Sequence, residues 1–128
     1  MEDPTTRLLA LLLCEEVTTD DGGIQTLRGV FDLTLAPSFP MTVPMHVFVK
    51  LAGTRPSSLD LAVVNVETGA ELGFFGFTMH PGPPSITLHQ TYPLTAVFAV
   101  PGDYEVRLSV DGAALAVAPW TVRPLTPP

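Results

Sequence analysis

Residues 7–17 read RLLALLLCEEV, and the interpretation of this stretch decides both the fold and the compartment of the chain. A single arginine is followed by seven uninterrupted apolar residues, the last of which is the only cysteine in the sequence. Three interpretations are open: a secretion signal, a lipid-attachment site, or the first strand of a β fold.

The residues around the apolar run favour the strand. A secretion signal has a basic segment before its apolar core, whereas residues 1–7 are net acidic here. Lipoprotein cleavage sites favour a small residue before the cysteine, but Leu13 precedes Cys14. Seven residues are also too few to cross a membrane, which takes about twenty. We therefore expect a β-strand at the N-terminus.

The following residues predict a hairpin. Asp20–Gly23 (DDGG) is typical turn material and separates the first strand from a second β-rich segment at residues 24–36. Leu27, Phe31, Leu33 and Leu35 are expected on the inward side of that second segment. The unbroken leucine run predicts a first strand that is covered on both faces or meets another subunit.

Period-two alternation continues almost to the end of the chain, and no helical period lasts eleven residues. Residues 37–44 (PSFPMTVP) are expected to form a loop because three prolines exclude a central strand. Pro119 is expected to interrupt the last strand. The expected strands are 7–17, 24–36, 45–53, 59–66, 72–80, 86–90, 94–100, 104–110 and 114–123. The pattern predicts an all-β chain: an antiparallel β-sandwich, immunoglobulin-like in outline, with about nine strands.

Length and composition narrow the class further. A chain of 128 residues forms one domain, here 1–128, with 1–6 and 124–128 expected as loose ends. The net charge is −7 and no cluster of Lys or Arg exists, so nucleic acid and anionic membranes are not expected partners. A single cysteine cannot form an internal disulfide, which favours a reducing, cytoplasmic location.

The low charge content predicts an apolar surface. Charged residues make up 15% of the chain, against about 25% in ordinary globular chains, and mean hydropathy is positive. Exposed apolar patches usually mark a partner or a subunit interface. The alternative is that Thr, Ser, Pro and Gly cover the surface instead, as in many β-sandwiches.

Two resemblances support this class. The segment PGDYEVRLSVDG (101–112) resembles the late hairpin of immunoglobulin-like sandwiches, with Tyr104 placed as in a tyrosine corner. Residues 12–53 resemble a family of small bacterial proteins of unknown function, through Gly29-Val30-Phe31 and the Pro37–Pro40 loop, with a later Gly102–Tyr104 hairpin. The family resemblance implies a compact cytoplasmic β-sandwich and supplies no catalytic residues.

Residues that could carry chemistry are scattered. The acidic set Glu15, Glu16, Asp20 and Asp21 is interpreted as a solvated hairpin tip, although an ion at the Asp20–Asp21 turn stays open. The histidines (His46, His80 and His89) are not within five residues of one another, although a turn could bring His80 and His89 together. Cys14 ends an apolar run and is expected to be buried and inert. We expect no catalytic residue, no metal and no cofactor.

An aromatic segment, GFFGF (73–77), gives the candidate interaction residues. Phe75, Phe77 and Met79 share one face of the expected strand, while Leu72 is expected to join Phe74 on the other. We name Phe48, Leu72 and Phe74 as a possible interaction surface. The alternative is that loops cover both faces.

Three functions remain open. The first is a non-enzymatic module that binds another protein or itself through an apolar sheet face or edge. The second is a small-ligand or carbohydrate-binding sandwich that uses aromatics such as Phe74 or Trp120. The third is an enzyme with a non-standard acid or Cys/His site, which the absence of standard nucleophile motifs disfavours. We expect the first, and hence no enzyme.

Overall fold

The computed structural model describes residues 6–80 and 82–125, and these residues form nine β-strands and no helix. The strands are β1 (Arg7–Thr19), β2 (Gln25–Phe31), β3 (Leu33–Ala36), β4 (Met41–Thr54), β5 (Ser58–Asn65), β6 (Glu71–Thr78), β7 (Ser85–Phe98), β8 (Gly102–Val110) and β9 (Ala113–Pro124). They build a four-stranded sheet with the order β2-β1-β4-β7, called sheet A, and a five-stranded sheet with the order β3-β9-β8-β5-β6, called sheet B. The all-β prediction is confirmed.

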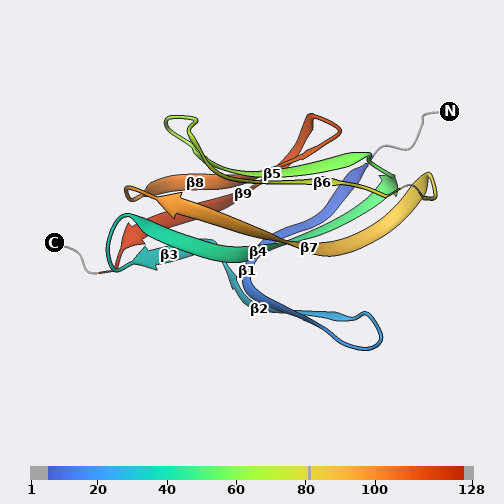
Figure 1. Ribbon diagram of the computed structural model, residues 1–128, viewed down its shortest axis with the longest axis horizontal. Coiled ribbons are helices and arrows are strands. Elements are labelled where there is room, and N and C mark those ends of the chain that lie inside the picture. The colour runs from blue at the N-terminus through green and yellow to red at the C-terminus, as the bar shows by residue number, and fades with distance from the viewer. Residues whose placement is uncertain (1–5, 81, 126–128) are drawn as a thin grey trace.

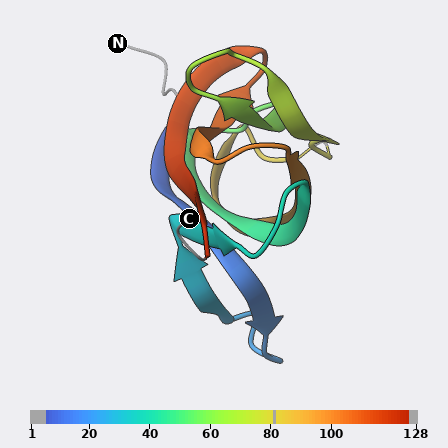
Figure 2. The ribbon, with the colours of Figure 1, turned by 90° about the vertical axis from the view of Figure 1, so that its left-hand side faces the viewer.

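The two sheets form two layers around one apolar core (Figure 1). Alternate residues of β4 are fully buried, and the residues between them face outward, as strand geometry requires. Trp120 lies inside the core with its ring 4.8 Å from that of Phe98 and 5.5 Å from that of Phe31. Sheet B curls around this interior (Figure 2), so the layers also meet at their sides. There, a side chain on Gly73 of β6 would collide with the Thr95 carbonyl of β7.

The expected second strand, 24–36, is divided between the two sheets. β2 pairs with β1 in sheet A, whereas β3 pairs with β9 in sheet B, and this last ladder is parallel. The chain crosses between the layers at Asp32. The crossing turns Leu33 and Leu35 toward the outside, so the prediction that they face inward was wrong.

Three prolines lie inside strands where the sequence predicted breaks. Pro44 belongs to β4, Pro93 to a continuous β7 that replaces the expected strands 86–90 and 94–100, and Pro119 to an unbroken β9. Proline is excluded only where a neighbouring strand needs its N–H. Pro44 lies beyond His46, where the pairing of β4 with β1 ends. Pro119 lies before Thr121, where the pairing of β9 with β3 begins, and Pro93 lies on β7, which is an edge strand. Each proline therefore has an unpaired side.

The hairpin turns lie at Asp20–Gly23, where the sequence predicts one, and between the expected strands 104–110 and 114–123. β1 and β2 are joined at Asp20–Gly23, and β8 and β9 at Asp111-Gly112. The expected loose ends fall mostly outside the described residues, but Thr6 donates a hydrogen bond to the carbonyl of Thr54 and Leu125 donates one to that of Ala36. The described residues contain no helix of the length and apolar character needed to cross a membrane.

Candidate interaction surfaces

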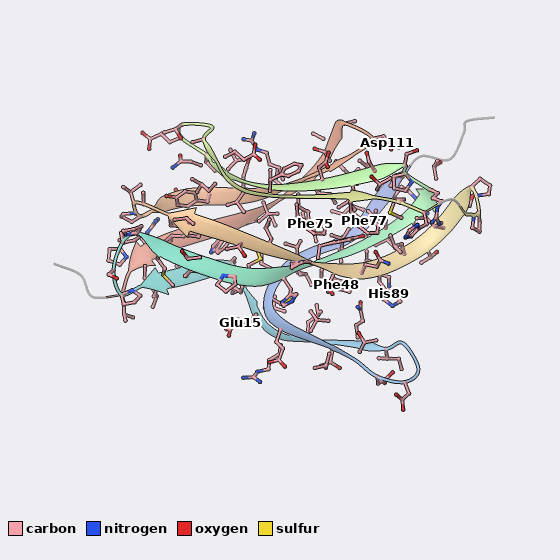
Figure 3. All side chains as sticks on the ribbon, viewed as in Figure 1. Glu15, Phe48, Phe75, Phe77, His89 and Asp111 are labelled. Carbon is pink, nitrogen blue, oxygen red and sulfur yellow. The ribbon has the colours of Figure 1, made fainter. Side chains whose placement is uncertain are left out.

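The residues expected to form one interaction surface lie on opposite sides of the molecule. Phe48 is on the outer face of sheet A, between buried Val47 and Val49, and Figure 3 shows it below β4 and away from the core. Phe74 is on the outer face of sheet B, where 60% of it is exposed. The structure does not bring these two residues together.

Leu72 does not accompany Phe74, and this part of the prediction was wrong. The β5–β6 register shifts by one residue between Val63, which is opposite Gly73, and Val64, which is opposite Glu71. Leu72 is therefore the extra residue of a β-bulge. It turns inward and packs against the core, where Phe75 and Phe77, which share one face of β6, also lie between the sheets (Figure 3).

An apolar row crosses the outer face of sheet B. Phe74 of β6 is opposite Ala62 of β5, Ala62 is opposite Arg107 of β8, and Arg107 is opposite Val117 of β9. Val117 is 55% exposed. The two large apolar side chains thus stand on the same line across four strands, on either side of Ala62 and Arg107. Sequence reasoning missed Val117, although alternation with the inward Trp120 and Ala118 offered a weak signal.

Two ion pairs and one further carboxylate, that of Asp60 beside Phe74, lie on this face. Nε of Arg107 lies 2.7 Å from a carboxylate oxygen of Glu105, and a guanidinium nitrogen of Arg123 lies 3.3 Å from one of Asp103. Exposed ion pairs of this kind contribute little to stability. They offset the charges of Glu105 and Asp103 and leave the carboxylate of Asp60 on this face.

A second surface is the part of the β1–β2 hairpin that extends beyond β4, which we call the ribbon (residues 15–30). Pairing of β1 with β4 ends at Cys14, opposite His46, while pairing with β2 continues to Thr19. Figure 2 shows the ribbon projecting away from the two layers. Its largest exposed apolar side chains are Ile24, 67% exposed, and Val30, 54% exposed.

The acidic turn at the tip of the ribbon is held by its own backbone. Oδ1 of Asp20 accepts hydrogen bonds from the backbone N–H groups of Gly22 (2.8 Å) and Ile24 (3.0 Å). This is the common role of aspartate in turns. In residues 6–80 and 82–125, no three His, Cys, Asp or Glu side chains converge as metal ligands would.

The candidate nucleophile is buried, whereas His80 and His89 are exposed. Burial raises the pKa of the Cys14 thiol, whose Sγ lies 3.6 Å from the His46 carbonyl oxygen. A protonated, inaccessible thiol is a poor nucleophile. The ring of His46 lies against the Glu15 carbonyl, Nδ1 to O 3.3 Å. His80 follows β6, and His89 lies on the outer face of β7 (Figure 3).

Comparison with known proteins adds a family but no activity. The model of the family described as "Family of unknown function (DUF6941)" matches residues 9–123. A solved structure of the Pseudomonas fluorescens alkylpurine DNA glycosylase AlkC, bound to DNA containing an abasic site analog, is similar with 14% identity and a TM-score of 0.46. That match covers 92% of this chain and 30% of the glycosylase chain. A comparison with curated proteins gives no match.

Proposed function

Since the chain belongs to DUF6941, a family of unknown function, we propose its role from its own surfaces: a non-enzymatic module that binds another protein or its own copy. The predicted membership of a family of unknown function is confirmed by the match over residues 9–123. The family itself supplies no substrate and no partner.

The observation that carries the proposal is the row on the outer face of sheet B. Phe74 is the most exposed aromatic side chain among the described residues, and full burial of such a side chain contributes about 1.5–3 kcal/mol. Val117 stands on the same line, and the neighbouring arginines are paired with carboxylates of the same face. A face that carries large exposed apolar side chains between paired charges suits contact with another protein surface.

The non-enzymatic part of the proposal rests on the state of the reactive groups. Cys14 is fully buried with a raised thiol pKa, so it does not offer a nucleophile to a substrate. The carboxylates of Glu105 and Asp103 are paired with arginines. The ligand-binding alternative is weakened because Trp120 is fully buried and its indole N–H donates to the hydroxyl of Thr34 at 2.7 Å.

We also propose an immunoglobulin-like outline and a cytoplasmic location. The Tyr104 hydroxyl donates to the carbonyl of Val100 at 2.6 Å, which is the contact that a tyrosine corner makes before a late strand. The parallel pairing of β3 with β9 and the curl of sheet B depart from a simple antiparallel sandwich. The lone, buried Cys14 suits a reducing compartment.

The test is a charge placed on the apolar row. We expect Phe74→Asp to lower self-association, measured as solution mass by light scattering over a hundredfold concentration range, or to lower retention of a protein partner by the immobilised chain. Thr78→Asp is the matched control, because Thr78 is exposed on the same strand and adds the same charge without removing an apolar side chain. Equal behaviour of the two variants in both measurements would contradict the proposal.

A further inference from the structure

Three of the four edge strands carry protection against pairing with another chain. β7 contains Pro93, β3 has only four residues, and β6 lies against β7 at Gly73. Natural proteins protect sheet edges in these ways. β2 is less protected, because its seven residues include no proline or lysine: Arg28 is its only charged side chain, and Gly29, with a φ of 69°, is its one position in the left-handed region. Figure 2 shows no other strand beside its outer edge.

The register of the hairpin shows which backbone groups this edge presents. The N–H of Asp20 donates to the carbonyl of Ile24 at 3.0 Å, so this is a hydrogen-bonded pair of the antiparallel ladder. Hydrogen-bonded and non-hydrogen-bonded pairs alternate along such a ladder. The backbone groups of Thr26 and Arg28 therefore point to β1, while those of Gln25 and Leu27 point to the free edge.

We propose that β2 pairs antiparallel with β2 of a second copy of this chain, with the two-fold axis at Leu27. This inference rests on the proposed interaction role but uses a different surface from the Phe74 row. In this register the outward backbone groups of Leu27 meet those of Leu27 in the second copy. Ile24 then lies opposite Val30 of the second copy, and Thr26 opposite its Arg28.

The side chains select this register among the symmetric ones. Ile24 and Val30 are the largest exposed apolar side chains of the ribbon, and they stand on one face because the β1–β2 register is the same on both sides of Gly29. A shift of the axis to Arg28 would place two arginines directly opposite, which is destabilising. A shift to Thr26 would place Ile24 opposite Arg28. Of these three axes, only the one at Leu27 places Ile24 opposite Val30.

The surroundings of Val30 also fit the incoming residue. Val30 lines an apolar depression of about 290 Å³ at the base of the ribbon, together with Leu12 of β1 and Pro119 of β9. Ile24 of the second copy arrives beside this depression in the proposed register. Two short strands bury less than a standard interface, so we expect a weak dimer.

A proline placed at the two-fold axis tests the pairing. Leu27→Pro removes an N–H that faces the free edge and leaves the β1–β2 ladder intact, whereas Leu27→Val keeps this N–H and is the matched control. We expect light scattering at millimolar concentration to show a dimer for the wild type and Leu27→Val, and at least a tenfold weaker dimer for Leu27→Pro. Equal association of the two variants would overturn the inference.

Disulfide trapping tests the register itself. Residue 24 of one copy and residue 30 of the other form a close, non-hydrogen-bonded pair in the proposed dimer. In a Cys14→Ser background, Ile24→Cys and Val30→Cys are therefore made as two separate proteins, so that only a mixture of them brings the two cysteines together. We expect the mixture to form a cross-linked dimer under mild oxidation at least ten times faster than either protein alone. Equal rates in the mixture and in the single proteins would overturn the register.

Comparison of the Phe74→Asp and Leu27→Pro variants separates this inference from the proposed function. If Phe74→Asp abolishes association while Leu27→Pro does not, the β2 pairing is wrong and the interaction role stands. If Leu27→Pro abolishes association and Phe74→Asp changes neither association nor partner retention, the β2 pairing stands and the Phe74 row is not the contact surface.

Discussion

Tyr92 shows how one polar group is accommodated in the core. Its ring lies on the inner face of β7, 5.5 Å from the rings of Phe75 and Phe77, and its hydroxyl donates to the side-chain carbonyl of Gln90 at 2.8 Å. Burial raises the pKa of the Tyr92 phenol to about 12. The fold therefore holds this side chain neutral at a pH where it ionises in the unfolded chain.

The raised pKa predicts a loss of stability at high pH. The unfolded phenol releases its proton near pH 10 and the folded one near pH 12, so between these values the unfolded chain binds fewer protons. The free energy of unfolding therefore falls as the pH rises through this window, and the contribution is fully present below about pH 10. Urea unfolding at about pH 9 and about pH 11.5 measures this effect.

Tyr92→Phe isolates this residue from the other titratable groups of the chain. We expect the variant to lose less stability than the wild type between the two pH values, because phenylalanine has no proton to release. A difference between the two proteins that is the same at both pH values would contradict the assignment.

At the scale of strands, Gly73 fixes how closely β6 approaches β7. A Cβ at this position would collide with the Thr95 carbonyl oxygen, which belongs to the backbone and cannot rotate away. Gly73→Ala is expected to lower the free energy of unfolding by about 1–3 kcal/mol through overpacking, measured by urea denaturation. Gly76→Ala on the same strand is the control, because the atoms nearest to its Cβ would belong to the side chains of Asp60 and Phe74, which can move. A smaller loss for Gly73→Ala than for Gly76→Ala would contradict this account.

The strands also show which features the sequence could predict. The turns at residues 20–23 and 111–112 and the alternation of β4 were predicted because each is encoded locally, by Asp-Gly chemistry or by a period of two. Pro44 and Pro93 were misread, because whether proline breaks a strand depends on which neighbour needs its N–H. The bulge that turns Leu72 inward depends on the register with β5, which the segment 72–80 does not encode by itself.

At the scale of the whole molecule, the distribution of side chains between faces was only partly predictable. Alternation placed Phe74 on the face opposite Phe75 and Phe77, and the structure shows that Phe74 is exposed while the other two pack inward. The Phe74–Val117 row depends on the order β6-β5-β8-β9, and the ribbon depends on where β4 stops pairing with β1. Both are long-range pairings that composition and periodicity leave open. The low charge content indicated an apolar surface without indicating its place.

The net charge of −7 leads to a last prediction, for the salt dependence of the β2-paired dimer. Two copies with this charge repel each other, while the proposed contact between Ile24 and Val30 is apolar. Salt shortens the range of repulsion, from about 10 Å at 0.1 M to about 3 Å at 1 M. We expect the dissociation constant to fall several-fold between these concentrations, measured by sedimentation equilibrium. A dimer held by ion pairs between Arg28 and the acidic turn would become weaker as salt is added. A rise in the dissociation constant with salt would therefore assign the contact to charges rather than to the apolar pair.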